Sequence, residues 1–392
     1  MSAMLEPAQV TTLLLPAAVI FMATLFAAYA ASKDRMLSVT AAAIKALILV
    51  AYFGFVFDDT RTLLDDVTYA QYGAELREQG IGLFNFYQHW PLLRATFGTD
   101  TFFYYVYNSF AFSVFNTNQY FAPVALNLVL TAVIAFLGYR LVKNEFGIDD
   151  LAAKVFFFFL LFHPDILVWS NLLNIKDILI LLIHVLLLTA IAQFFNRKVL
   201  SGTLILIPVI PIILLSRYYV LGLFAGALVL SMLISTRDYR VRLGAIAGSG
   251  LALLVIYLAK GSSAFTFPLH LIEHTFVNPA YGFVRFLLTP IPFNTDTEYT
   301  FLNIPAVIHW LLMPFLLLGV YKVWTIASSF CRFLVIYFVV FLCTYAVTGE
   351  LQGPRHRVQL DFAIASFQFM GILTAYKWVQ ARRMLTKAQS IQ

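Results

Sequence analysis

The chain has 392 residues, of which 61% are apolar and only 12% are charged. Its mean hydropathy of +0.83 excludes a water-soluble globular protein, which could not bury so much apolar surface. The net charge of +6 comes from basic residues in short segments beside apolar runs, so we expect the lipid bilayer and no nucleic acid as a partner.

Eleven apolar segments predict an all-α fold, a polytopic bundle of transmembrane helices. A helix of about 20 apolar residues crosses the ~30 Å hydrocarbon core of a bilayer. The predicted spans are 10–31, 37–57, 120–139, 151–164, 177–195, 199–215, 219–235, 242–259, 304–321, 330–348 and 358–376. Without an internal repeat or a separate soluble region, we expect residues 1–392 to form a single integral membrane domain.

Basic residues predict which connections face the cytoplasm. They fall in alternate connections: Lys33 and Arg35; Arg140 and Lys143; Arg197 and Lys198; Arg237, Arg240 and Arg242; Lys322; and Lys377, Arg382, Arg383 and Lys387. The remaining connections, including the two long loops 58–119 and 260–303, then lie outside the cytoplasm. We therefore expect a multi-pass protein of the plasma (inner) membrane with an extracytoplasmic N-terminus and a cytoplasmic C-terminus.

An acidic cluster follows the second predicted span and therefore faces the extracytoplasmic side. Its members are Asp58, Asp59, Asp65 and Asp66. Asp58 and Asp59 fit solvated loop residues, whereas Asp65 and Asp66 begin a predicted helix, where the helix dipole favours negative charge. A carboxylate at the rim of a membrane cavity can also take a proton from a hydroxyl nucleophile. Asp65 and Asp66 are therefore candidate catalytic residues.

Two interfacial helices are predicted within the first long loop. In the segment 65–79, Val67, Ala70 and Ala74 recur at helical spacing, and this apolar face is expected to rest on the membrane. The aromatic stretch 102–115 is too short for a span and is typical of an interfacial or re-entrant helix.

The external turn after the fourth predicted span carries a second group of candidates. Asp165, Lys176 and Asp177 lie in or beside this turn. A fixed lysine suits an anionic headgroup, and the two carboxylates suit a sugar hydroxyl or a metal ion. The alternative is that Asp177 is only a helix N-terminal charge and Lys176 only an interface anchor. The spacing supports no metal site, so no cofactor is assigned and a divalent cation stays open.

External arginines form a third group, because they run against the positive-inside bias. Arg217 lies in a very short external turn. Two interpretations are open: it binds a substrate phosphate, or its side chain only extends to the phosphates of the surrounding lipid. Arg355-His356-Arg357 precedes the last span, and the arginines suit bidentate phosphate contacts. Asp361 follows Arg357 by four residues, so we expect an internal ion pair between them.

The second long loop contains His270, Glu273, His274 and Arg285. The histidines are four residues apart, which is a weak zinc half-site that lacks the His-Glu-x-x-His order, so a polar loop helix is the preferred interpretation. Arg285 is a further candidate for substrate binding. The chain lacks nucleotide-binding signatures, and its predicted cytoplasmic loops are short, so an activated substrate has to be presented at the outer face.

Several short motifs resemble those of the GT-C superfamily of membrane glycosyltransferases, in particular the bacterial protein mannosyltransferase and aminoarabinose transferase groups. Asp65-Asp66-Val67-Thr68-Tyr69 is similar to the acidic pair and tyrosine of their first external loop. Asn127 through Gly147 is similar to a helix that ends in a cytoplasmic Phe-Gly. The pattern from His163-Pro164-Asp165 through Ser170 to Lys176-Asp177 looks like one in exopolysaccharide-locus relatives, and Arg355 and Arg357 fall where relatives carry an arginine.

This resemblance implies a donor sugar linked to polyprenyl phosphate and a glycan or glycolipid acceptor. It implies that Asp65 is the general base, supported by Asp66 and Tyr69. Phosphate would be bound by Lys176, Arg217, Arg355 and Arg357, and Asp165, Asp177, Arg285 and His356 complete the predicted substrate-binding set.

Two alternatives share the lipid-linked substrate. A polysaccharide repeat-unit polymerase needs the same phosphate chemistry, many spans and external arginines. A lipid-linked oligosaccharide flippase or other transporter predicts charges deep in several spans and two pseudo-symmetric halves, whereas most charges here lie near the predicted outer rim, with Lys45 and Asp361 as exceptions.

Overall fold

The computed structural model describes residues 8–58, 62–98, 101–235, 239–261, 275–294 and 297–389. Within these ranges all regular secondary structure is helical, apart from an isolated bridge between Phe276 and Thr348, which confirms the all-α class. The α-helices are α1 (Val10–Ser32), α2 (Arg35–Phe55), α3 (Leu64–Glu78), α4 (Trp90–Phe97), α5 (Phe103–Phe115), α6 (Phe121–Glu145), α7 (Asp150–Leu161), α8 (Pro164–Asn171), α9 (Asp177–Phe195), α10 (Val199–Leu214), α11 (Tyr219–Ser235), α12 (Tyr239–Lys260), α14 (Pro279–Leu288), α15 (Asn303–Trp324), α16 (Ser329–Val347), α17 (Pro354–Arg357) and α18 (Asp361–Gln389). Short 3-10 turns are η3 (Phe86–His89), η4 (Thr297–Leu302), η5 (Gly349–Leu351) and η6 (Val358–Leu360).

Eight helical segments of the described chain are long and apolar enough to cross a membrane. They are Val10–Ser32, Arg35–Phe55, Phe121–Glu145, Asp150–Asn171, Asp177–Phe195, Tyr299–Trp324, Ser329–Val347 and Pro354–Met384. Three predicted spans fall on shorter apolar helices, Val199–Leu214, Tyr219–Ile234 and Ile246–Lys260. The polytopic helical character is therefore confirmed, while the crossing of the three shorter helices and the sidedness stay predictions.

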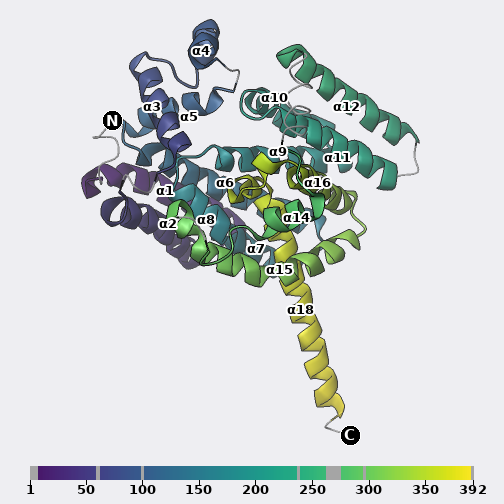
Figure 1. The fold of residues 1–392 in the computed structure, drawn as a ribbon. Coiled ribbons are helices and arrows are strands. Elements are labelled where there is room, and N and C mark those ends of the chain that lie inside the picture. Colours follow the sequence, from purple (N-terminus) through teal and green to yellow (C-terminus); the bar gives the residue numbers. More distant parts are fainter. Residues whose placement is uncertain are drawn as a thin grey trace.

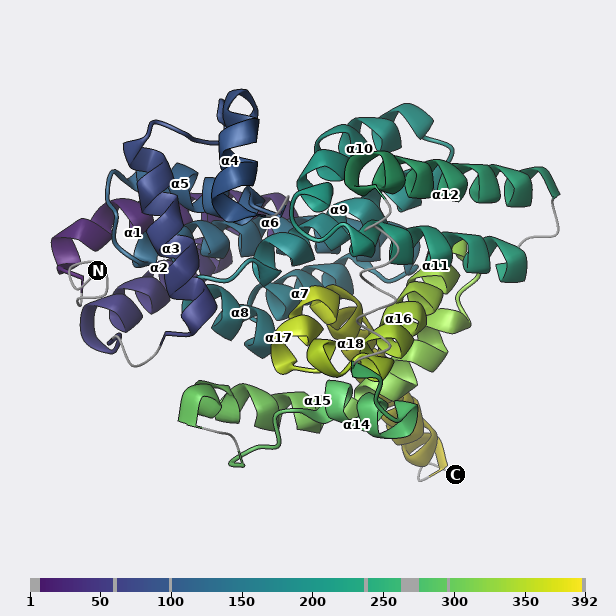
Figure 2. The same cartoon turned by 45° about the horizontal axis from the view of Figure 1, so that its top comes forward.

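Helices α6 and α9 form the middle of the bundle. They pack against each other, and α6 also contacts α1, α5, α7 and α8 (Figures 1 and 2). Two-thirds of the apolar stretch of each helix is buried, against 28% for α1. Side chains on all faces of α6 and α9 therefore contact protein, whereas α1 leaves an apolar face for lipid.

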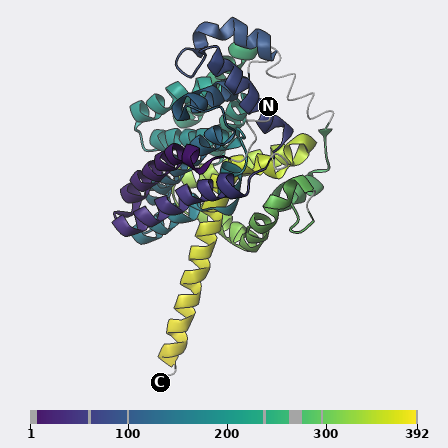
Figure 3. The same ribbon diagram turned by 90° about the vertical axis from the view of Figure 1, so that its left-hand side faces the viewer.

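The last helix is held by close packing with α15. A Cβ atom at Gly319 would overlap the carbonyl oxygen of Phe367, and one at Gly371 would overlap that of Phe315. Such small residues let two membrane helices approach closely. Beyond this contact α18 leaves the body of the bundle and runs alone to the C-terminus (Figures 1 and 3).

The first long loop folds against the bundle as α3, α4 and α5. The predicted helix start at Asp65 is confirmed within one residue, but its apolar face does not rest on the membrane as predicted. Ala70 and Ala74 are buried in a cluster with Phe112 of α5 and Phe121 of α6. Gly73 lies so close to Asn108 that a Cβ atom would overlap it, so α5 covers this face of α3.

Some sequence predictions fall outside the described residues. These are Asp59 and the group His270, Glu273 and His274. Lys45 is buried on α2, where its ammonium donates to Thr131 Oγ1 on α6 at 2.8 Å. It is therefore paired within the bundle, one of the two readings that a charged residue in a span allows.

Candidate functional site

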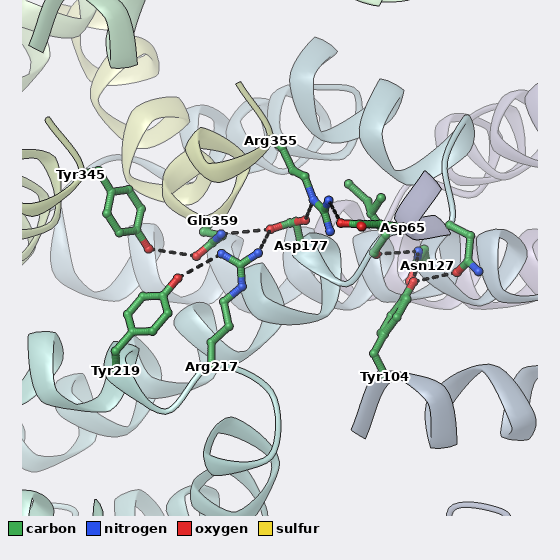
Figure 4. A network of polar contacts seen from close by, with 11 residues as sticks. Asp65, Tyr104, Asn127, Asp177, Arg217, Tyr219, Tyr345, Arg355 and Gln359 are labelled. Atoms are coloured by element: carbon green, nitrogen blue, oxygen red, sulfur yellow. Dashed lines mark hydrogen bonds and ion pairs between the residues drawn. The ribbon is translucent and has the colours of Figure 1, made fainter. Parts of the chain in front are cut away.

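Asp177 is the centre of a charged group that joins segments far apart in the sequence. It opens α9 and is fully buried. Its Oδ1 accepts hydrogen bonds from Arg217 Nη2 and Gln359 Nε2, both at 2.9 Å. Its Oδ2 accepts from Arg355 Nε at 2.7 Å (Figure 4). The three donors offset the cost of burying this carboxylate, so Asp177 is more than a helix N-terminal charge.

Arg355 connects this buried carboxylate to an exposed one. Its Nη1 lies 2.6 Å from Asp65 Oδ2, and the Asp65 side chain is 56% exposed. The Asp65–Arg355–Asp177–Arg217 chain therefore brings together α3, α17, α9 and the turn between α10 and α11 (Figure 4). We call these four residues together with Lys176 and Tyr69 the charged site.

Lys176 adds a cation without a carboxylate partner. Its ammonium lies 5.8 Å from the centre of the Tyr69 ring, and it forms no ion pair with the described residues. Burial, reinforced by the positive charge of Arg217, lowers the pKa of Lys176 to about 8. Burial also raises the pKa of Tyr69 to about 12, so this phenol stays protonated at neutral pH.

Asp66 points into the protein although Asp65 does not. It is fully buried, and Tyr120 Oη donates to its Oδ2 at 2.5 Å. The same hydroxyl accepts from the backbone N–H of Asn174 at 2.9 Å, and Asn174 Nδ2 donates to the Asp66 carbonyl oxygen at 3.1 Å. Asp66 therefore fixes the start of α3, which also carries Asp65, to the start of α6 and to the turn before α9.

Tyr104 and Asn127 extend this polar network beneath α3. Tyr104 Oη donates to Asn174 Oδ1 at 2.9 Å and accepts from Asn127 Nδ2 at 3.2 Å (Figure 4). All three side chains are fully buried or nearly so. Because buried amides and hydroxyls are costly without partners, this network specifies how α5, α6 and the turn before α9 fit together.

We predict that Asp66→Asn removes a pH-dependent part of the stability. Burial raises the pKa of Asp66 from 3.8 to about 6, so between these values the folded state binds the proton more tightly than the unfolded state. Stability then falls as pH rises through this window, by about 3 kcal/mol. In detergent, the unfolding midpoint of Asp66→Asn should rise relative to that of the wild type as the pH is raised from 4 to 7. An equal difference at both pH values would contradict the prediction.

A second buried group lies around Asp165. Asp165 Oδ2 is 3.3 Å from Arg357 Nη2 and 3.3 Å from His309 Nδ1. The predicted ion pair between Arg357 and Asp361 is wrong, because Arg357 pairs with Asp165 and also donates to the carbonyl oxygens of Leu287 and Thr289. The side chain of Arg357 is only 2% exposed. Within the described residues its guanidinium thus bonds buried partners around Asp165.

Two further candidates do not join the charged site through a direct contact. The imidazole of His356 is half-buried, with its ring centre 6.3 Å from that of Tyr345. Arg285 is exposed on α14, and its nearest polar partner is Gln352 Oε1 at 3.5 Å. The structure therefore brings together Asp65, Tyr69, Lys176, Asp177, Arg217 and Arg355, and leaves Arg285 outside.

Several residues of the charged site and of the group around Asp165 were not predicted from the sequence. Gln359 donates to Asp177, and Tyr345 Oη donates to Gln359 Oε1 at 3.0 Å. His309 is a polar residue inside a predicted span, which is costly without a role, but it is not among the predicted site residues. That signal was available for His309 and Gln359, whereas nothing in the sequence pairs Tyr345 with either.

An apolar cavity of about 350 Å³ lies between α9, α10, α11 and α12. Leu187, Phe194, Leu206, Leu221, Phe224 and Val255 are among the residues that line it. Leu221 of the lining lies on the first turn of α11, and Arg217 lies in the connection just before that helix.

Comparison with known proteins gives no relative: no family model, no curated protein and no solved structure matches this chain. A functional assignment therefore rests on the geometry and chemistry of the charged site.

Proposed function

We propose that this protein is a membrane glycosyltransferase that moves a sugar from a polyprenyl-phosphate donor to an acceptor hydroxyl at the extracytoplasmic face of the plasma membrane. The supporting observation is the exposed carboxylate of Asp65, held by Arg355, which also bonds the buried Asp177. A proton acceptor that is open to solvent thus lies beside Arg355, and the buried Asp177 holds both Arg355 and Arg217 in place.

In the proposed reaction, an acceptor hydroxyl attacks the anomeric carbon of the donor sugar. The hydroxyl proton moves to Asp65 as the new carbon–oxygen bond forms. The bond between the anomeric carbon and the phosphate oxygen breaks, and the electron pair leaves with the polyprenyl phosphate. A single displacement of this kind inverts the anomeric configuration.

The charge balance of the site favours an anionic ligand. Arg217, Arg355 and Lys176 are cations, and the two carboxylates of the site neutralise only two of them. The phosphodiester of a polyprenyl-phosphate sugar carries one negative charge, which would balance Lys176. Preorganised cations of this kind stabilise the charge that develops on a leaving phosphate.

The apolar cavity between α9 and α12 is placed to take part of the prenyl chain. Its lining is almost wholly apolar, and it lies within the segments that are long or apolar enough to sit in the bilayer. A lipid donor would then reach the charged site with its phosphate near Arg217 and its chain among the membrane helices.

We predict that binding of the donor weakens as pH rises through 8. The pKa of Lys176 is lowered to about 8, so Lys176 is mostly charged at pH 7 and mostly neutral at pH 9. The phosphodiester keeps its charge over this range, so KM for the donor should rise about tenfold between these pH values. Lys176→Arg should flatten this dependence, because guanidinium stays protonated. A wild-type KM that does not change from pH 7 to pH 9 would contradict the role of Lys176.

Lipid-linked glycans from a deletion strain test the proposal in the cell. A transferase that completes or modifies a lipid-linked glycan predicts accumulation of a truncated glycan. Accumulation of a complete but unpolymerised repeat unit would instead identify a repeat-unit polymerase, which uses the same phosphate chemistry.

A transporter of lipid-linked oligosaccharide is the second candidate, favoured by the buried carboxylates of Asp165 and Asp361. Cation-coupled transporters carry ionisable residues within their spans. Movement of a fluorescent lipid-linked oligosaccharide across liposomes containing the purified protein, without sugar transfer, would support this function over the transferase.

A further inference from the structure

Four potential ligand groups from three helices and a helix junction converge below the charged site. His163 Nδ1 or Nε2, an Asp165 oxygen and an Asp361 oxygen lie within 4.8 Å of one another. His309 Nδ1 lies 3.3 Å from Asp165 Oδ2. All four side chains are at most 2% exposed. They come from the α7–α8 junction, α8, α15 and the start of α18.

The hydrogen bonds of the two histidines fix which ring nitrogen carries the proton. His163 Nε2 lies 3.0 Å from Gln368 Oε1, and His309 Nε2 lies 2.8 Å from the Leu287 carbonyl oxygen. The Leu287 carbonyl oxygen can only accept, so His309 Nε2 is an N–H donor, and Gln368 presents its amide oxygen to His163 Nε2, which is then a donor as well. In the neutral form of each ring Nδ1 then presents a lone pair; neither Nδ1 forms a hydrogen bond with the described residues, and His309 Nδ1 lies 3.3 Å from Asp165 Oδ2. This arrangement, with one ring nitrogen oriented by an acceptor, is what metal-binding histidines show.

The two carboxylates of the group differ in their partners. Both oxygens of Asp361 are buried and have no hydrogen-bond partner among the described residues. Asp165 Oδ2 accepts from Arg357 Nη2 at 3.3 Å, and His309 Nδ1 lies at the same distance from it. With both carboxylates ionised and both imidazoles neutral, one guanidinium leaves one net negative charge in a buried place, which is strongly unfavourable unless a cation balances it. A positively charged ligand that accepts electron pairs would balance this charge and bond the unpaired nitrogen and oxygen atoms.

We infer that His163, Asp165, His309 and Asp361 bind a divalent transition-metal ion of the zinc class. Imidazole nitrogens and carboxylate oxygens in a set of four are a ligand combination that zinc accepts in tetrahedral geometry. The ion would tie α8, α15 and α18 together beneath the charged site. This binding site is independent of the proposed transfer reaction, because its residues do not contact Asp65 or Asp177.

The full-length protein, purified in detergent without added metal, provides the test. Elemental analysis should find about one zinc-class ion per chain, and Asp361→Asn should lower this to less than about 0.1. After treatment with a chelator, Zn²⁺ should restore the ion and raise the unfolding midpoint of the wild type by roughly 3 °C or more. Co²⁺ in place of Zn²⁺ should give the intense visible absorption of a four-coordinate site.

Asp150→Asn is the matched control, because Asp150 is an exposed carboxylate that pairs with Lys143 and Lys154 away from this group. It should keep the ion. The inference is overturned if chelator-treated wild-type protein binds neither Zn²⁺ nor Co²⁺, which would mean that protons or water balance the group. It is also overturned if Asp361→Asn retains the wild-type metal content. These readouts measure metal and not sugar transfer, so they stand whether or not the transferase proposal holds.

Discussion

Replacing Asp65 with Asn is expected to reduce sugar transfer by about 10²- to 10⁴-fold, the usual contribution of a general base. The amide has nearly the same shape and keeps an oxygen that can accept from Arg355, which lies 2.6 Å from the wild-type carboxylate. It cannot take the proton from an acceptor hydroxyl. Because the Asp65 side chain is more than half exposed, the substitution leaves no buried group unpaired, and the fold should be unchanged.

The measurement is the rate of transfer at saturating donor, together with the unfolding midpoint. Glu78→Gln is the matched control, since Glu78 is an exposed carboxylate at the other end of α3. The control should retain full activity. Full activity in Asp65→Asn would remove Asp65 from the role of base, and an equal loss in Glu78→Gln would show that the effect is not specific to Asp65.

Replacing Arg355 with Ala is expected to weaken donor binding and also to destabilise the protein. The guanidinium bonds Asp65 and Asp177 together, and Asp177 is fully buried. Removing one partner of a buried ion pair costs about 3–5 kcal/mol, and here the remaining bonds from Arg217 and Gln359 should hold the loss to the lower end. The donor Kd should rise about 10²-fold, because one of three cations near the phosphate is lost.

Arg355→Lys separates the two effects. A lysine keeps the charge but cannot bridge both carboxylates, so it should recover part of the donor affinity while Asp65 loses its fixed position and kcat stays low. Arg383→Ala, in the exposed last part of α18, should change neither quantity. Unchanged donor affinity in folded Arg355→Ala would exclude a phosphate role for this arginine.

The helices of this fold follow from the sequence more closely than its contacts do. The segments 177–195 and 219–235 begin and end at the predicted residues, because long apolar runs bounded by charged or aromatic residues leave little freedom for the ends. The start of α3 is predicted within one residue from the paired acids in its first turn. The direction in which a helix turns its apolar face depends on distant parts of the chain. For this reason the sequence did not predict that α3 packs on α5 instead of resting on the membrane.

The site was predicted as a set of residue types, but its pairing was not. External charged residues are candidates because charge is rare in this chain, and two carboxylates, two arginines and a lysine of the predicted set meet beside Tyr69. Sequence spacing favoured Arg357 with Asp361, four residues apart on one helix. In the structure Arg357 bonds Asp165, which lies 192 residues away. Helix neighbours are visible in a sequence, whereas partners brought together by the packing of α8, α15 and α18 are not.

Transfer by the purified protein in liposomes tests the central proposal most directly. A panel of polyprenyl-phosphate hexoses and pentoses would be supplied with glycan acceptors, and both the glycosylated acceptor and the released polyprenyl phosphate would be measured. The proposal predicts that one donor yields the two products in equal amounts, with inverted anomeric configuration, and that Asp65→Asn yields neither. Movement of lipid-linked sugar across the bilayer with no release of polyprenyl phosphate from any donor would contradict it.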